Sequence, residues 1–171
     1  MPVLSSANKH VYLERFGKIA SDAKPLWGKM TGAQMIGHVT GTLLYTLGDT
    51  PVLPFRGNFK TQYVYAPLLL NGILNFPKNI KIPQSKKAKP IQFTDGTIDT
   101  LAATIDRVLA EMDAGEFHPP HHPFFGHIGP QKWMKFHAAH FDQRRALFPN
   151  GHDAPRMMST GCTRAAFRAG I

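Results

Sequence analysis

The stretch 31-TGAQMIGHVTGTLLYTLG-48 decides the fold class of this chain. Thr31 followed three positions later by Gln34 is a capping box, in which each side chain satisfies a free backbone N–H at a helix start. Apolar residues then recur at helical spacing, which gives a helix one apolar face: Met35, Ile36, Val39, Leu43, Leu44 and Leu47. The stretch therefore predicts an amphipathic helix that ends near Gly48.

Further segments show helical periodicity, and no segment alternates as convincingly as a strand does. They lie at about 6–20, 62–75, 98–114 and 130–148. Pro67 either kinks its helix or marks the true start, Gly115 lies where a helix C-cap belongs, and Pro130 takes a permitted first-turn position. Long amphipathic helices without strands pack as a bundle, so the sequence predicts an all-α fold with long loops.

The length of 171 residues suits one domain. We expect a helical domain over 1–148 and a basic tail over 149–171 that is either docked or flexible. The single cysteine, Cys162, excludes an internal disulfide and a cysteine-based zinc site. Because neither a secretory signal nor a transmembrane segment is apparent, the sequence predicts a cytoplasmic protein.

Charge is distributed unevenly along the chain. Twenty Lys and Arg residues against eleven Asp and Glu residues give a net charge of +9. The stretch 56–89 carries seven basic residues and no acidic one, whereas 95–116 carries six acidic residues. Either the two stretches form surfaces that attract each other, or the basic one binds an acidic partner. No nucleic-acid-binding motif accompanies it, which disfavours a nucleic-acid partner.

The nine histidines are the candidate chemical groups. His38 lies on the helix predicted from Thr31. On the last helix one inward stripe carries Trp133, His137, His140, Arg144 and Leu147. Imidazoles on facing helices of a bundle are a usual way to build a metal site, and neutral imidazole suits zinc, nickel, iron and copper alike. The alternatives are a hydrogen-bonded core role for His38 and surface positions for His137 and His140.

Two motifs resemble one branch of the DinB-like superfamily. The first is WGKMTxxQMxxH over 27–38; the second is HPFFG over 122–126, followed by Pro130, Trp133 and His140-x-Asp142. The resemblance covers about residues 10–148. It implies an up-down-down-up four-helix bundle, often a homodimer, with a divalent metal held by one histidine of the second helix and two of the last. Some members of the superfamily are thiol-dependent transferases or isomerases, and many have no known activity.

By this resemblance His38 matches the first ligand and His140 the second, but the third position holds Arg144. A guanidinium is always charged and offers no lone pair to a metal. One possibility is that His137 supplies the third nitrogen; another is that a loop histidine does so, and the candidates are His118, His121, His122 and His127. The remaining possibility is that the metal site is lost and Arg144 binds an anion.

Three hypotheses follow for the function. With zinc, nickel or iron on His38, His137 and His140, the chain is a metal-dependent hydrolase or thiol transferase. Without a metal, Arg144 and Trp133 belong to a pocket for a small anionic molecule. As an interaction protein, the chain uses its basic stretch on acidic partners. The sequence identifies no catalytic residue.

Overall fold

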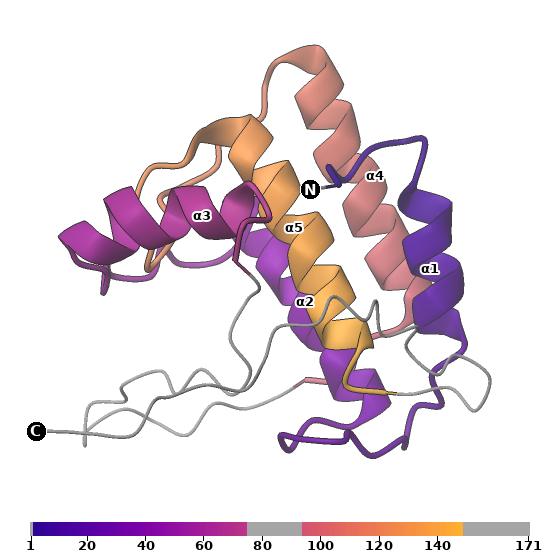
Figure 1. Cartoon of the computed structure of the whole chain (residues 1–171). Helices are drawn as coiled ribbons and strands as arrows, with labels where there is room; N and C mark the ends of the chain where they lie inside the picture. The colour runs from indigo at the N-terminus through magenta and orange to yellow at the C-terminus, as the bar shows by residue number, and fades with distance from the viewer. Residues whose placement is uncertain (1, 75–93, 149–171) are drawn as a thin grey trace, which may run out of the picture.

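The computed structural model describes residues 2–74 and 94–148. Within these ranges the regular structure is helical, apart from one isolated bridge between His122 and Gly126, which confirms the all-α prediction. The helices are α1 (Lys9–Gly17), α2 (Gly32–Thr46), the π-helical η1 (Thr61–Tyr65), α3 (Ala66–Leu70), α4 (Ile98–Ala114) and α5 (Gly129–Arg145) (Figure 1). The predicted tail over 149–171 and the lysines from 78 to 89 lie outside the described residues.

Helix ends follow the predicted capping residues. At the start of α2, the Gln34 backbone N–H donates to Thr31 Oγ1 over 3.3 Å, and the Thr31 backbone N–H donates to Gln34 Oε1 over 3.2 Å. The capping box is therefore present. At the end of α4, Gly115 has a φ of +73°, a left-handed conformation that a β-carbon disfavours.

The helix predicted over 62–75 is shorter than expected and is not uniform. The chain forms the π-helical turn η1 and then α3, which ends at Leu70. Pro67 lies in the first turn of α3 and has no N–H to donate to the preceding turn. The N–H of Ala66, one residue earlier, reaches back five residues to the Thr61 carbonyl, which is the hydrogen-bond pattern of a π-helix.

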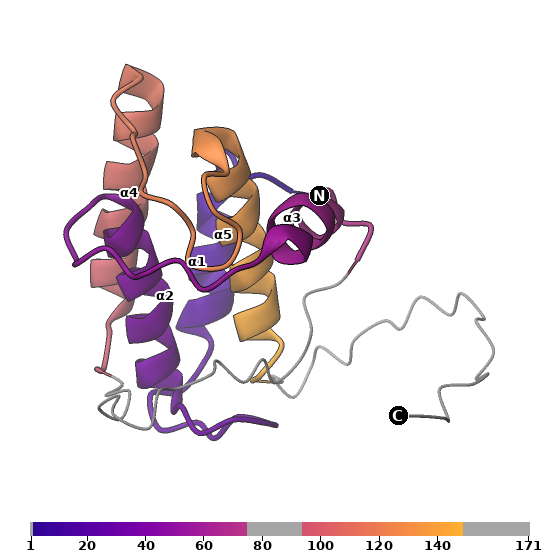
Figure 2. The ribbon, with the colours of Figure 1, turned by 90° about the vertical axis from the view of Figure 1, so that its left-hand side faces the viewer.

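The four longer helices α1, α2, α4 and α5 lie side by side around one apolar core (Figures 1 and 2). In Figure 1, α2 and α4 run upward along the chain, whereas α1 and α5 run downward. Helix α2 contacts both α4 and α5, α1 contacts the same two helices, and α3 packs against α5. This arrangement sets α2 antiparallel to α5, with the predicted histidines on the two facing helices.

Helix α5 supplies the centre of the core. Phe141 is buried between α5 and α1, where Tyr12 and Phe16 each meet its ring edge-on with centroids 5.5 Å apart. Edge-to-face pairs of this kind add to the free energy gained by burying the rings. Trp133 and Met134 on the same helix are almost inaccessible to solvent. The rotation of α5 about its axis is thereby fixed, and the stripe that carries His137 and His140 points inward, as predicted.

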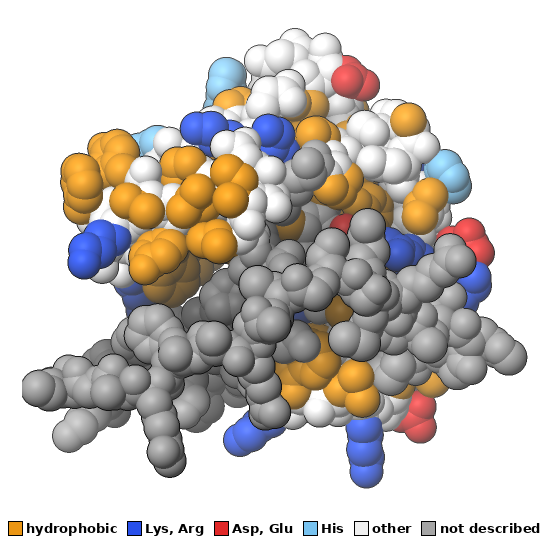
Figure 3. All heavy atoms as spheres, viewed as in Figure 1, with side chains coloured by type: hydrophobic (Ala, Val, Ile, Leu, Met, Phe, Trp, Pro, Cys, Tyr) orange, Lys and Arg blue, Asp and Glu red, His pale blue; other side chains and the backbone are white. Residues whose placement is uncertain are grey.

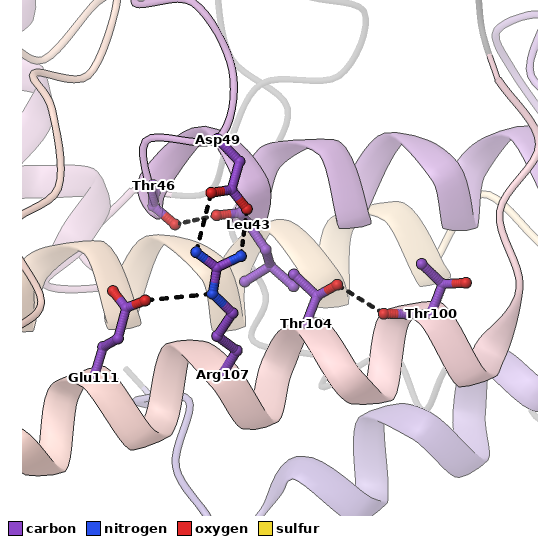
Figure 4. Close-up of polar contacts among 7 residues, drawn as sticks. All are labelled: Leu43, Thr46, Asp49, Thr100, Thr104, Arg107 and Glu111. Atoms are coloured by element: carbon purple, nitrogen blue, oxygen red, sulfur yellow. Dashed lines mark hydrogen bonds and ion pairs between the residues drawn. The ribbon is translucent and has the colours of Figure 1, made fainter.

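Helix α2 is held against α4 at both ends. Near its start, a β-carbon on Gly37 would lie 2.0 Å from the Thr94 carbonyl oxygen, so only glycine permits this approach. Beyond its end, Arg107 of α4 donates two hydrogen bonds to the Asp49 carboxylate and lies 3.4 Å from Glu111 (Figure 4). These contacts fix the position of the helix that carries His38.

Acidic residues of the 95–116 stretch pair within the helical core domain. Asp106 pairs with Lys9 of α1, and Glu111 lies beside Arg107 on its own helix. At these two positions the acidic side chains therefore pair with basic residues outside the stretch 56–89. Among the described residues, no helix combines the length and the apolar content that crossing a membrane requires.

Candidate functional site

His38 of α2 and His140 of α5 meet at the interface between the two helices. Their Nε2 atoms are 3.2 Å apart, and their rings are nearly perpendicular, at 88°. His140 is buried and His38 is half-buried. The two residues are separated by 102 positions in the chain, so the antiparallel packing of α2 on α5 creates this pair. The structure brings together two of the three predicted metal-ligating residues.

Arg144 completes the group from the next turn of α5. Its Nε–H donates a hydrogen bond of 2.9 Å to Nε2 of His140. Because Nε2 accepts this bond, His140 carries its proton on Nδ1 when it is neutral. His140 Nδ1 is buried and has no hydrogen-bond partner among the described residues.

The hydrogen bonds around His140 also assign the proton of His38. A neutral imidazole has one nitrogen lone pair, and that of His140 points at both His38 and Arg144. Two facing lone pairs would repel each other. The arrangement is favourable when His38 carries its proton on Nε2, so that His38 and Arg144 share one acceptor.

Both imidazoles are neutral at physiological pH, and Arg144 is the charged group of the site. Burial, and then the nearby Arg144 charge, lower the pKa of His38 to about 4. Burial and the neighbouring His38 hold the pKa of His140 well below its ordinary value. Burial also lowers the pKa of Arg144, but a guanidinium remains charged in proteins. The group therefore carries one positive charge.

This positive charge has no carboxylate partner among the described residues. Asp142, two positions before Arg144, instead forms an ion pair of 2.9 Å with Arg15 of α1. Arg144 itself is only partly exposed. A cation that is partly removed from water and left without a counter-ion is costly. The site is thus electrostatically suited to an anion.

His137 lies apart from the pair. Its Nε2 is 3.3 Å from Thr46 Oγ1, and that hydroxyl donates to the Leu43 carbonyl over 2.7 Å (Figure 4). Thr46 therefore accepts from His137, which places the imidazole proton on Nε2. The ring stacks on Trp133 at 27°, and burial lowers its pKa to about 3. His137 is fully enclosed and directs its protonated nitrogen at Thr46 instead of at His38.

Trp133, predicted to line a ligand pocket with Arg144, is 1% exposed. Its indole N–H donates to the Pro120 carbonyl over 3.2 Å. This bond and its burial make it a core residue that ties the loop before α5 to the helix.

Two of the loop histidines, His121 and His122, make local hydrogen-bond contacts. Nδ1 of His122 accepts from the backbone N–H groups of Phe124 and Phe125, both at 3.1 Å, and its ring stacks on Phe125 with centroids 4.3 Å apart. His121 contacts the Leu53 carbonyl through Nε2 at 2.9 Å. His118 and His127 are exposed. His122 therefore stabilises its own turn and the packing of both phenylalanines.

The residues present do not fit a metal centre while Arg144 keeps its place. Two nitrogen ligands about 2.0–2.1 Å from one tetrahedral ion lie roughly 3.3–3.4 Å apart, so the separation of His38 and His140 alone resembles that of two ligands. However, the Arg144 N–H points at the lone pair that a metal would need, and its charge repels a cation. Over 2–74 and 94–148, no three His, Cys, Asp or Glu residues are grouped to hold an ion.

Sequence reasoning missed Thr46 as the partner of His137. The available signal was spacing, because His38, Thr42 and Thr46 recur every four residues and so share one face of α2. A hydroxyl on that face is a natural partner for a second buried imidazole of α5.

The surface of the described residues has a hollow of about 330 Å³ near the N-terminal end of α5. Its walls come from the segment before α1, from α4 and from the first turns of α5, including Leu4, Met112 and Met134. None of the lining residues belongs to the His38–His140 pair, so the hollow is separate from the candidate site.

No protein-family model, curated protein or solved structure matches the chain. The likeness to the DinB-like superfamily rests on the two sequence motifs.

Proposed function

We propose that this chain is a DinB-like four-helix bundle of up-down-down-up order that binds a small oxyanion, a carboxylate or a phosphate group, at Arg144. In this proposal the His38–His140 pair holds Arg144 in position, and the site works without a metal.

The helix directions support the DinB-like part of the proposal. Helices α1 and α5 run one way and α2 and α4 the other, which is the order that the resemblance implies. The two motifs lie on elements that touch, since the first ends at His38 on α2 and the second includes His140 on α5.

The observation that carries the anion proposal is the hydrogen bond from Arg144 Nε to His140. It uses one edge of the guanidinium and leaves the terminal nitrogens as a planar fork. Such a fork binds a carboxylate or a phosphate through two parallel hydrogen bonds. The imidazoles beside it are neutral, so Arg144 is the group of this site with which an anion would pair. Partial burial strengthens the attraction because the local dielectric constant is low.

Inorganic phosphate and acetate are expected to raise the thermal unfolding midpoint of the wild-type protein. Binding to the folded state alone stabilises it by about 2.7 kcal/mol at a ligand concentration of about 100 times Kd. In Arg144→Gln this gain is lost, because the neutral amide offers no cationic fork. The measurement is thermal unfolding by circular dichroism over a concentration series of each anion.

Phosphate also stabilises many proteins without binding, because it is excluded from their surfaces. The decisive quantity is therefore the difference between the wild type and Arg144→Gln at the same anion concentration. Lys132→Gln is the control, since it removes an exposed positive charge of the same helix α5 and should leave the anion-dependent gain intact. An equal gain in all three proteins would contradict the proposed site.

A further inference from the structure

A second surface of the protein, around α3, is rich in exposed hydrophobic side chains (Figure 3). Nine of the eleven large hydrophobic side chains that are exposed in the described residues lie within 51–74. They are Val52, Leu53, Phe55, Phe59, Tyr63, Val64, Tyr65, Ile73 and Leu74. Phe59 is 72% exposed and Ile73 is 68% exposed. Figure 3 shows hydrophobic side chains gathered over α3, with Lys and Arg side chains at their margin. We call these nine residues the apolar face.

The segment formed by the turn η1 and helix α3 carries apolar side chains on two sides. On the inner side, Ala66, Leu69 and Leu70 are buried, and α3 packs against α5. On the outer side, Val64 and Tyr65 are open to solvent. Here one side has a protein partner and the other side has none among the described residues.

The apolar face is held in place by polar contacts at its base. The Arg56 N–H donates to the Pro123 carbonyl over 2.7 Å, and the Thr61 N–H donates to Asn58 Oδ1 over 2.9 Å. The Phe59 ring lies against that of Tyr63, with centroids 4.8 Å apart and the planes tilted by 38°. These side chains stand on an ordered turn instead of folding onto the core. Exposed apolar patches of this kind on otherwise well-packed proteins mark interaction sites.

The charge of this surface specifies the kind of partner. No acidic residue occurs between Asp49 and Asp95. Within the described part of that stretch, Arg56 and Lys60 are exposed, and each directly follows an exposed phenylalanine in the sequence. Asp49 is already paired with Arg107. A partner must therefore offer both an apolar phase and negative charge.

A second copy of this chain does not meet that requirement. A two-fold symmetric interface places the same patch on both sides, so a second copy would bring further basic side chains and no acidic one from the stretch between Asp49 and Asp95. A nucleic acid supplies negative charge, but its phosphates offer nothing to aliphatic side chains such as Leu53 and Ile73. The headgroup region of an anionic bilayer supplies both, because apolar side chains enter the acyl boundary while basic ones remain among the headgroups.

We propose that the apolar face, together with Arg56 and Lys60, binds to the surface of an anionic membrane as a peripheral contact. The exposed aromatic rings enter the interface between headgroups and acyl chains, where amphipathic rings are favoured. Lys60, at the start of η1, contacts the anionic headgroups.

The test is co-sedimentation of the full chain with vesicles of phosphatidylcholine alone and of an equal mixture of phosphatidylcholine and phosphatidylglycerol. We expect binding to the mixed vesicles, much weaker binding to the neutral ones, and a decrease as salt is added. The double variant Phe59→Ala with Tyr63→Ala should bind about tenfold more weakly or worse, because it removes the rings that enter the interface. Lys60→Glu should bind at least about fivefold more weakly.

The controls change equivalent side chains elsewhere. Leu26→Ala removes a side chain that is 64% exposed outside the apolar face, and Lys24→Glu reverses an exposed charge there. Both should bind like the wild type. Circular dichroism and the thermal midpoint establish that each variant folds; if the aromatic double variant fails to fold, Lys60→Glu against Lys24→Glu decides.

Three results would overturn the proposal. One is the absence of binding to anionic vesicles at low salt. Another is equal loss of binding in Lys24→Glu and Lys60→Glu, which would indicate attraction by net charge alone. The third is a dimer in analytical ultracentrifugation that Phe59→Ala with Tyr63→Ala converts to a monomer while vesicle binding stays absent, which would assign the face to self-association.

Discussion

The protein is expected to lose stability steeply as the pH falls below about 6.5 and to unfold within a few pH units. Four histidines are held neutral by burial: His38, with a pKa of about 4, His122 and His137, each with a pKa of about 3, and His140, with a pKa well below its usual value. In the unfolded chain each of them titrates near pH 6.5. Between the two pKa values the unfolded state binds more protons than the folded state.

The sign of the effect follows from linkage. A histidine whose pKa is lowered by folding contributes its full stability above the unfolded pKa, and that stability is lost as the pH falls toward the folded pKa. Each such group costs up to about 1.4 kcal/mol per pH unit in this window. Four groups together approach about 5 kcal/mol per unit, against a total stability of about 5–15 kcal/mol for a typical domain. Urea unfolding at a series of pH values measures this slope.

Two variants test the assignment to these histidines. His122→Asn keeps an oxygen in place of the acceptor Nδ1 but cannot be protonated. The slope of the unfolding free energy against pH should therefore fall by the contribution of one proton, about 1.4 kcal/mol per pH unit. His10→Gln, which removes an exposed histidine of α1, is the control variant. Constant stability between pH 7 and pH 4.5 would contradict this assignment. It would show that the folded and unfolded states bind the same number of protons, so that folding does not keep the buried imidazoles neutral.

Arg144→His is expected to create a metal site that the wild type lacks. The substitution removes the cation beside His140 and supplies a third imidazole one turn along the same face of α5. Zinc or nickel should then stabilise the variant by about 4 kcal/mol when present at about 1,000 times Kd. The wild type should show little change under the same conditions, because its guanidinium repels the ion. Thermal unfolding with and without added metal, after removal of bound metal with a chelator, gives the comparison.

Arg144→Gln separates the two parts of this effect. It removes the positive charge without adding a nitrogen ligand, so its response to metal should stay well below that of Arg144→His. Adding His140→Ala to Arg144→His should abolish the response. If the wild type binds zinc as tightly as Arg144→His, then Arg144 does not block the pair, and the metal-dependent hypothesis regains support.

The extent of successful prediction differs among elements for physical reasons. Helix α2 was predicted almost to the residue because its capping box is a local interaction between Thr31 and Gln34. The helix around Pro67 was not, because Gly72 takes a left-handed φ of +74° just after Leu70, and this glycine was not used as a helix end in the prediction. The extent of the apolar face could not be predicted, because exposed and buried apolar residues look alike in a sequence and only packing distinguishes them.

For the candidate site, too, local patterns could be predicted and packing could not. The motifs placed His38 and His140 on facing helices, and the structure brings them together. Helical spacing put His137 on the same inward stripe, and it is indeed buried there. Spacing could not tell which residue of α2 it would meet, because that depends on the register of α2 against α5. The hydroxyl of Thr46 is the partner that the packing provides.

The most direct test of this account is the protonation state of His140, observed in a long-range proton–nitrogen correlation spectrum at neutral pH. The account predicts a neutral ring with the proton on Nδ1 and a bare Nε2 that accepts from Arg144, unchanged when zinc is added. A proton on Nε2 of His140, or a shift of that nitrogen on addition of zinc, would contradict it.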